Sequence, residues 1–343
     1  MSFVFATCRA GSEPSLKADV ARWHEGRLTP AFMRPQLITW KVRGQPPDSG
    51  FVLDSPFARV SGLSLGLCAS AAELIDKLRA TGERSLCLHA FPRETPEDGV
   101  PPETWRRIDA RQAPIISALT DAGFQLRPAS SLAHGDLVLD LLFDDADDAA
   151  FFAGLHRHHD GAHRQPGGLP RLTLPPHAPS RAWLKVEQAL AWRGWDTPEL
   201  QGRLALDLGC APGGASLALL DRGMRVTGVD TGDMDEAVLR HDSGAFRHLR
   251  TPVGRLDPAR LPAGVSLILC DINLAPPEVL PHIERLQRAL RAPRLILTLK
   301  LNIPALERRL DEFVDFIRGF SPAPVHVTQL AANRREVCVA AGV

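Results

Sequence analysis

The sequence predicts an α/β fold, in which an N-terminal α+β region is followed by a doubly wound, Rossmann-like parallel sheet. From residue 181 onward, short apolar runs alternate with segments whose apolar residues recur at helical spacing. Strands that alternate with helices are typical of a parallel sheet with helices on both faces. Residues 1–150 instead mix strands and helices without glycine-rich turns between them, which favours an α+β arrangement there.

The N-terminal region contains both kinds of element. Apolar or alternating runs predict strands at 3–9, 36–43 and 136–143, and helical spacing predicts helices at 69–80 and 111–124. We expect a division near residue 55, with an α+β subdomain over 1–55 and a second domain over 56–160.

An acidic group, Asp144, Asp145, Asp147 and Asp148, lies next to the apolar segment 149–155. Neighbouring carboxylates suggest a metal site as one interpretation. We favour a simpler one, in which 149–155 forms a helix and the acids lie at its first turn, where the helix dipole stabilises negative charge.

Residues 156–180 are rich in His, Pro, Gly and Arg, a composition typical of a connection between domains. The histidines match no metal-ligand spacing, and Arg157, Arg164 and Arg171 are interleaved with them. We therefore predict a solvated connection that contacts a polyanion, with the linker itself at 161–180, and we expect no metal.

Residues 181–343 are predicted as one domain. The predicted strands are 203–209, 225–230, 265–272, 294–301, 324–331 and 335–341, and the predicted helices are 183–195, 213–223, 276–292 and 304–320. Ser180 is expected to cap the first helix. No helix separates the last two strands, so we expect them to add an antiparallel edge to the sheet.

Composition excludes several classes of protein. The chain has 343 residues, 44% hydrophobic and 23% charged, as folded proteins do. Its basic and acidic residues balance at 40 each, so no overall charge indicates a nucleic-acid or membrane partner. Six scattered cysteines without a C-x-x-C pair suggest neither disulfides nor zinc. No apolar stretch approaches the ~20 residues of a membrane helix, and we expect a cytoplasmic protein.

Lysine is rare in this chain. Only five of the 40 basic residues are lysines, and the others are arginines. Arginine keeps its proton in a protein, whereas lysine loses its proton when its surroundings lower the pKa. The remaining lysines, above all Lys185 and Lys300, are therefore candidates for amine chemistry.

The segment 206–214, LDLGCAPGG, predicts a strand, a glycine-rich turn and a helix start. Gly209, Gly213 and Gly214 allow a sharp turn and close approach to a ligand. The dinucleotide fingerprint G-x-G-x-x-G is absent, and Pro212 lacks the N–H that a pyrophosphate would accept. The next strand ends in Asp230, placed to bind ribose hydroxyls. These features predict a nucleoside cofactor without a pyrophosphate, S-adenosyl-L-methionine, and argue against a nicotinamide oxidoreductase.

Four charged residues fall where a catalytic group belongs in such a sheet. Asp271 and Lys300 end predicted strands, Glu336 starts the last one, and Lys185 lies on the helix before the first strand. Each alone is explained by a turn cap or an exposed charge. Their joint occurrence, with two of only five lysines, predicts a catalytic site.

This set of residues resembles the K-D-K-E tetrad of the FtsJ-type (RrmJ-like) ribose 2′-O-methyltransferases. The segments 167–190, 270–272, 297–301 and 333–339, with the N-terminal stretch 4–20, are similar to the RlmM branch of these enzymes, so the resemblance covers nearly the whole chain. It implies methylation of a cytidine ribose in large-subunit rRNA, a THUMP domain that binds RNA within residues 1–160, and a monomer. It also implies cofactor contacts at Ser180, Asp207, Gly209, Ala211, Pro212, Gly213, Gly214, Asp230 and Asp271.

Within this resemblance, we hypothesise that Lys300 is the general base, with its pKa lowered by desolvation and by the charge of Lys185. Asp271 would orient Lys300, while Lys185 and Glu336 would hold the hydroxyl in line with the methyl group. The chain departs from the family at Thr251 and Pro252. At this point of the sequence the family has an acidic residue that lies near the adenine. Backbone groups or Asp233 are the candidates to replace it.

RNA binding requires a local positive charge. Arginines gather at 240, 247, 250, 255 and 260, and again at 285, 288 and 291. Phosphate contacts or solvated helix faces explain the second group equally well. Two alternatives to rRNA methylation remain, the same chemistry on tRNA or another RNA, and a non-catalytic RNA-binding assembly factor.

Overall fold

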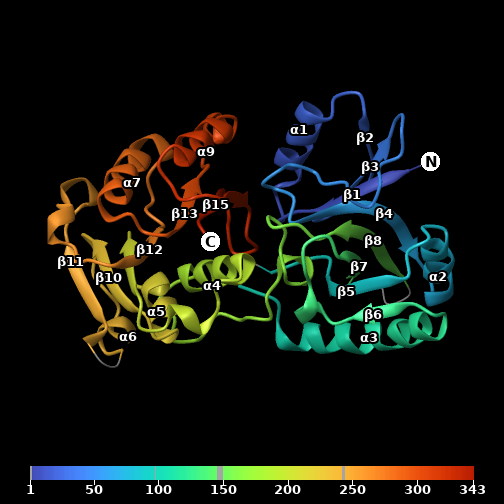
Figure 1. Cartoon of the computed structure of the whole chain (residues 1–343), viewed down its shortest axis with the longest axis horizontal. Coiled ribbons are helices and arrows are strands. Elements are labelled where there is room, and N and C mark those ends of the chain that lie inside the picture. Colours follow the sequence, from blue (N-terminus) through green and yellow to red (C-terminus); the bar gives the residue numbers. More distant parts are fainter. Residues whose placement is uncertain (1, 97, 145–149, 242–243) are drawn as a thin grey trace. The chain divides into compact units, whose positions relative to one another are not determined.

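The computed structural model describes residues 2–96, 98–144, 150–241 and 244–343 (Figure 1). The chain divides into two compact units, Met1–Thr173 and Leu174–Val343. This division lies inside the predicted linker at 161–180.

The first unit is built on one eight-stranded sheet with the order β2-β3-β1-β4-β8-β7-β5-β6. Its strands are β1 (Phe3–Thr7), β2 (Leu28–Arg34), β3 (Leu37–Val42), β4 (Val60–Cys68), β5 (Ser85–Pro92), β6 (Gln125–Arg127), β7 (Leu137–Phe143) and β8 (Phe151–Arg157). Its helices are α1 (Glu13–Trp23), α2 (Ala71–Arg79) and α3 (Pro102–Asp121). α2 and α3 contact each other, and they pack on β4 and β5. The α+β prediction for this region is confirmed.

The sheet continues across the expected subdomain boundary near residue 55. β1 pairs antiparallel with β4, with Val4 opposite Leu63 and Thr7 opposite Val60. The strands on both sides of residue 55 therefore share one ladder of hydrogen bonds, and residues 1–55 have no sheet of their own.

The helix predicted at 149–155 is wrong, because Phe151–Arg157 forms strand β8 between β4 and β7. Residues 151–156 are all buried. A strand covered on both faces shows a continuous apolar run, which periodicity alone does not distinguish from a buried helix. Of the acidic group, Asp144 accepts hydrogen bonds from Arg93 at 2.6 and 3.1 Å, and the other three acids lie outside the described residues.

The predicted solvated connection at 156–180 is also corrected. His156, His158 and His163 are buried. The short helix η2 (Pro166–Gly168) packs on β5, where a Cβ on Gly167 would lie 2.4 Å from the Phe91 ring. The first part of this segment therefore folds back over the sheet of the first unit.

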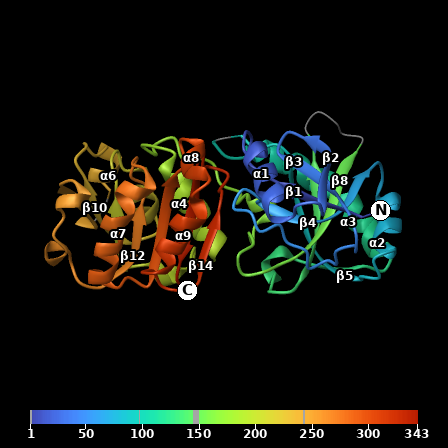
Figure 2. The same cartoon turned by 90° about the horizontal axis from the view of Figure 1, so that it is seen from above.

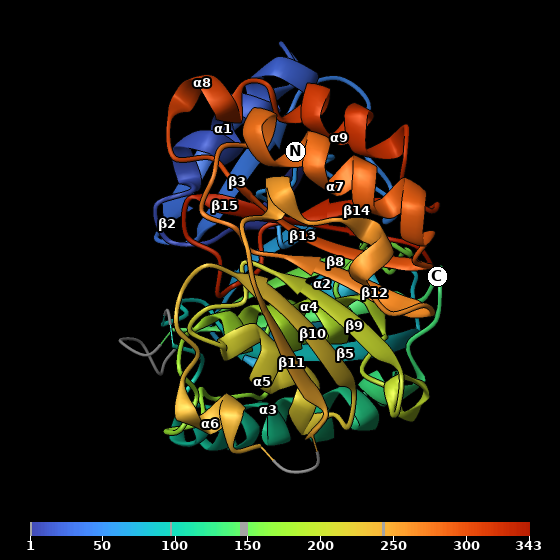
Figure 3. The ribbon, with the colours of Figure 1, turned by 90° about the vertical axis from the view of Figure 1, so that its left-hand side faces the viewer.

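The second unit contains a seven-stranded sheet with the order β11-β10-β9-β12-β13-β15-β14 (Figure 3). Its strands are β9 (Leu204–Leu208), β10 (Arg225–Asp230), β11 (Phe246–Arg250), β12 (Val265–Cys270), β13 (Arg294–Lys300), β14 (Val325–Thr328) and β15 (Glu336–Ala341). Its helices are α4 (Ala182–Arg193), α5 (Gly214–Asp221), α6 (Glu236–Leu239), α7 (Pro276–Leu290), α8 (Pro304–Glu307) and α9 (Leu310–Arg318). α7 and α9 lie side by side on one face (Figure 2), and α4 and α5 contact each other on the opposite face (Figure 1).

This topology confirms the predicted Rossmann-like sheet with an antiparallel edge. The five strands from β11 to β13 pair in parallel, and β15 runs antiparallel to both β13 and β14. The carboxyl ends of β9, β10, β12 and β13 therefore meet at one edge of the sheet. The register of β13 and β15 places Lys300 directly opposite Glu336.

The structure differs from the predicted elements in two ways, because it adds strand β11 and the short helix α6, which were not predicted, and because it divides one predicted helix. The helix expected over 304–320 is divided into α8 and α9, and α9 alone presents a buried apolar face, formed by Leu310, Phe313, Val314 and Ile317. Among the described residues, the helices include none that combines the length and the apolar character needed to cross a membrane.

Candidate functional site

The glycine-rich turn after β9 is shaped by backbone conformations that suit glycine. Gly209 has a φ of 82° and Gly213 a φ of 124°. A Cβ on Gly214 would lie 2.2 Å from the Ser180 hydroxyl oxygen, so only glycine lets the start of α5 approach residue 180. The Ser180 hydroxyl accepts a hydrogen bond from the Ala182 N–H at 3.3 Å, close to its predicted role, although the residue at the N-cap is Arg181.

Asp207 lies beneath this turn and is fully buried. One of its carboxylate oxygens accepts a hydrogen bond from the Ser216 hydroxyl at 2.6 Å, and the other has no hydrogen-bond partner. Burial raises the pKa of Asp207 to about 7. An unpaired acceptor of this kind in the interior is a position where a positively charged ligand group is favourable.

Asp230 ends β10 and is fixed by two backbone N–H groups. Ala211 donates to Oδ2 at 3.1 Å and Gly232 donates to Oδ1 at 2.8 Å. A carboxylate oxygen accepts two hydrogen bonds, so both oxygens keep a free lone pair for further donors. The predicted cofactor residues are thus gathered around one turn of the second unit.

These donors and acceptors fit S-adenosyl-L-methionine. The carboxylates of Asp207 and Asp230 offer acceptors to the amino and hydroxyl groups of an amino-acid-bearing nucleoside. Pro212 has no N–H in the turn where a pyrophosphate would need one.

The four tetrad residues form a closed ring of ion pairs. Lys300 Nζ lies 2.5 Å from Asp271 Oδ1 and 2.7 Å from Glu336 Oε2. Lys185 Nζ lies 3.0 Å from Asp271 Oδ2 and 2.6 Å from Glu336 Oε1. Each carboxylate thus gives one oxygen to each amine. The structure brings together the four residues that the sequence singled out.

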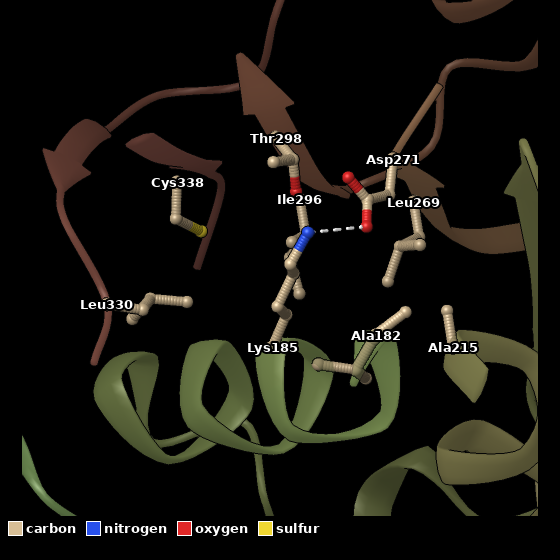
Figure 4. A pocket seen from close by; sticks show the side chains of 10 residues that line it. Ala182, Lys185, Ala215, Leu269, Asp271, Ile296, Thr298, Leu330 and Cys338 are labelled. Atoms are coloured by element: carbon tan, nitrogen blue, oxygen red, sulfur yellow. Dashed lines mark hydrogen bonds and ion pairs between the residues drawn. The ribbon is translucent and has the colours of Figure 1, made fainter. Parts of the chain in front are cut away.

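Figure 4 shows how Lys185 reaches this ring from α4, with its amine directed at Asp271. A small cavity beneath it is lined mainly by apolar side chains, among them Ala182, Leu269 and Ile296. The exposed fractions of the Lys300 and Glu336 side chains are only 9% and 8%. Charges so poorly hydrated interact more strongly than they would at the surface.

The expected lowering of the Lys300 pKa is wrong. Burial by itself lowers the pKa of Lys300, but the negative charges of Asp271 and Glu336 outweigh burial and raise it above the ordinary value. For Glu336, burial by itself raises the pKa, and the charges of Lys185 and Lys300 outweigh this and hold it at about 2. The sequence argument counted the charge of Lys185 but left out the effect that the charges of Asp271 and Glu336 have on the pKa of Lys300.

Two supporting residues escaped the sequence argument. Asn333 is fully buried and donates to Glu336 Oε1 at 3.3 Å, while its own side-chain oxygen accepts from the Leu330 N–H at 2.8 Å. Gln188 accepts from the Ala332 N–H at 2.8 Å and so ties the loop before β15 to α4. Gln188 follows Lys185 by three residues on α4, a spacing that places both on one face and was the available signal.

The predicted arginine clusters are partly engaged within the protein. Arg285 donates to the backbone oxygens of Leu256 at 2.7 Å and Val253 at 3.1 Å, so it holds the loop after β11. Arg288 pairs with Glu284 on its own helix. Arg250 pairs with Asp233, the side chain proposed for adenine. For Arg285, a structural role explains the residue better than a phosphate contact.

The fold and this site define a class of protein. The sequence pattern of the FtsJ-like methyltransferases matches residues 178–310, a range that includes Lys185, Asp271 and Lys300 and ends before Glu336. The chain therefore contains an FtsJ-like methyltransferase domain, and its cofactor is S-adenosyl-L-methionine.

Similar proteins carry a more specific name. The chain is 33% identical to a "Ribosomal RNA large subunit methyltransferase M" of Halorhodospira halophila over 97% of its own length and 94% of that protein. It is 44% identical to the protein of the same name from Methylococcus capsulatus, over 33% of this chain and 32% of that protein. The chain belongs to the ribosomal RNA large subunit methyltransferase M family, and it is an S-adenosylmethionine-dependent RNA methyltransferase.

Solved structures give weaker likenesses. TrmN from Thermus thermophilus covers 100% of both chains at 19% identity and a TM-score of 0.36. A putative ribosomal RNA methyltransferase from Plasmodium falciparum covers 48% of this chain and 97% of its own at 15% identity and a TM-score of 0.37.

The buried carboxyl of Asp207 leads to a prediction about stability. Its raised pKa keeps it protonated in the folded chain at pH values where the unfolded chain has already lost the proton. This stabilisation is complete below the ordinary aspartate pKa of about 4 and is lost as the pH rises through about 7. Between these values, the free energy of unfolding of the wild type should fall at least about 1 kcal/mol further than that of Asp207→Asn.

Urea denaturation of the cofactor-free chain at several pH values measures this difference. Asp315→Asn, which changes an acid on α9 whose side chain is 70% exposed, is the matched control and should follow the wild type. Identical pH dependence in the wild type and Asp207→Asn would show that Asp207 ionises normally.

Proposed function

We propose that this chain transfers a methyl group from S-adenosyl-L-methionine to a ribose 2′-oxygen of RNA, at a cytidine of large-subunit rRNA. The observation that carries the proposal is the ring of Lys185, Asp271, Lys300 and Glu336 beside the glycine-rich turn. The names of the full-length relatives support the ribosomal substrate. We further propose that the first unit contains the RNA-binding THUMP domain, and that the enzyme acts in the cytoplasm as a monomer.

The chemistry requires a base. When bound, the cofactor supplies an electrophilic methyl group on a positively charged sulfur. A ribose hydroxyl is a weak nucleophile at neutral pH, so its proton must be removed as it attacks. Lys300 is the proposed acceptor, because its amine lies at the carboxyl end of β13 and is fixed on two sides by Asp271 and Glu336.

The resting ion pairs set a condition on this role. A protonated amine accepts no proton, and the carboxylates favour the protonated form of Lys300. The active form is therefore the minor one with a neutral Lys300. In that form Asp271 and Glu336 still orient the Nζ, and Lys185 remains as the one cation paired with both carboxylates. Lys185 and Glu336 are then placed to hold the hydroxyl in position.

Two other functions are tested by the same experiment. The same chemistry on tRNA would use the same tetrad. A non-catalytic assembly factor would bind RNA without needing two buried lysines paired with two carboxylates, and the intact ring therefore favours the enzyme.

The purified chain should methylate one cytidine ribose in large-subunit rRNA taken from cells that lack the gene. Mass spectrometry of nuclease fragments locates the modified nucleotide, with total tRNA as a parallel substrate. Lys300→Ala should bind the cofactor in calorimetry and transfer no methyl group, while Arg318→Ala, an exposed change on α9, should behave as the wild type. Methylation of tRNA alone would favour the first alternative, and cofactor-independent RNA binding without methylation the second.

The raised pKa of Lys300 predicts an unusual pH profile. Because the neutral amine is a minor form, kcat/KM should rise about tenfold per pH unit from about pH 6 to about pH 9 without levelling off. Lys300→Ala should be slower than the wild type by ~10²–10⁴-fold. Small primary amines should restore part of the lost rate, in proportion to the concentration of the amine in its unprotonated form. Lys300→Arg should remain inactive, because arginine keeps its proton.

A flat pH profile, or substantial activity in Lys300→Arg, contradicts the assignment of Lys300 as the base. Cofactor binding measured at each pH separates an effect on chemistry from an effect on affinity.

Asn333 is predicted to position Glu336. Without the Asn333 amide, Glu336 Oε1 loses a hydrogen bond and keeps its ion pair with Lys185, so the carboxylate gains freedom to rotate. Asn333→Ala should lower kcat about tenfold with little change in the KM for the cofactor, since small misplacements of a catalytic group mainly affect the chemical step. Steady-state kinetics measure the split, and a change in KM alone would instead assign Asn333 to binding.

A further inference from the structure

Three polar side chains from three neighbouring strands converge in the interior of the first unit. His89 lies on β5, Asp140 on β7 and His156 on β8, and β7 pairs with both other strands. His89 is directly opposite Asp140. Asp140 is opposite Gly154, which lies two residues before His156 and so on the same face. All three side chains therefore point to one face of the sheet.

These side chains are buried more deeply than an ordinary polar group. The exposed fractions are 1% for His89, 0% for Asp140 and 5% for His156. Possible ligand atoms of the three residues all lie within 4.8 Å of one another. His156 Nδ1 lies 2.5 Å from Asp140 Oδ2, and His89 Nδ1 lies 3.9 Å from Asp140 Oδ1.

The hydrogen bonds of this cluster are incomplete. Neither ring nitrogen of His89 has a hydrogen-bond partner, and Oδ1 of Asp140 has none. Nδ1 of the neighbouring, buried His158 is also without one. Buried polar groups are almost always satisfied by protein, water or an ion, so unpaired atoms that converge at one point indicate something that binds there.

The surroundings exclude bulk water from the cluster. The Phe5 ring lies over Gly154, where a Cβ would meet it at 2.2 Å, and Gly167 lies against Phe91, which shares a face with His89. The carboxyl group of Asp140 is thus fully buried, with His89 and His156 beside it.

We propose that His89, Asp140 and His156 bind one divalent transition-metal ion of the zinc type inside the first unit. Imidazole nitrogens and a carboxylate oxygen are ligands that such ions prefer. A divalent cation would compensate the buried carboxylate and occupy the unpaired atoms of His89 and Asp140. His158 is the nearest candidate for a fourth ligand, and the ion would be incorporated as the chain folds.

The sequence argument against a metal rested on spacing within residues 156–180. Of the ligands proposed here, only His156 lies in that segment, and pairing of β5, β7 and β8 brings the other two to it, so spacing within the segment does not reveal them. The site lies outside the proposed methyltransferase machinery, and its test does not depend on activity.

The simplest rival is a proton. If His156 is protonated, its charge pairs with Asp140 at 2.5 Å and satisfies part of the cluster without a metal. That arrangement still leaves both ring nitrogens of His89 without hydrogen bonds.

The full-length chain, produced without a histidine tag and with zinc in the growth medium, is passed over a chelating resin and analysed for metals by mass spectrometry. We expect about one zinc ion per chain in the wild type. His89→Gln and Asp140→Asn should each retain less than a fifth of that amount. His134→Gln changes a histidine of the same unit whose side chain is 69% exposed, and it should retain the wild-type amount.

A wild-type chain without zinc overturns the proposal. Equal zinc in the wild type and in His89→Gln also overturns it, because that result shows an adventitious ion only. Should His89→Gln fail to fold, the wild type alone decides. After unfolding and refolding, its Tm should be higher with added zinc than with a chelator, and equal Tm values overturn the proposal.

Discussion

The second unit is organised around the alternating ring of two lysines and two carboxylates. Each of the four residues comes from a different part of the fold, from α4, from the end of β12, from β13 and from β15. Removal of one partner from a buried set of ion pairs leaves an uncompensated charge and costs about 3–5 kcal/mol. The ring therefore ties these four elements to one another, because loss of any one member leaves a charge without its partner.

Several features of the sheet follow from this constraint. Lys300 ends the parallel strand β13. Because β15 is antiparallel to β13, its first residue, Glu336, lies directly beside Lys300 and supplies the second acid of the ring after Asp271. The loop before β15 must then be held as well, and Asn333 and Gln188 hold it. The antiparallel edge thus has a chemical purpose in addition to extending the sheet.

The ring also shows why the charge state of a catalytic lysine depends on contacts. Desolvation lowers the pKa of Lys300, as the sequence suggested, but two carboxylates within 2.7 Å outweigh it and raise the pKa. In the resting protein these carboxylates therefore favour the protonated form of Lys300. The cluster of His89, Asp140 and His156 in the first unit differs from the ring, because one oxygen of the buried Asp140 has no hydrogen-bond partner there.

The sequence by itself determined most strands and helices of the second unit and the residues of its site. Alternating strands and helices have distinct periodicities, and the residues at strand ends must share one edge of a parallel sheet, so Asp230, Asp271 and Lys300 were predictable as neighbours. Tertiary structure alone decided what depends on partners distant in the chain. It made 151–157 a strand rather than a helix, because both faces are covered, and it buried the histidines that composition assigned to a linker. It also reversed the pKa shift of Lys300, because distances between side chains decide which charge dominates.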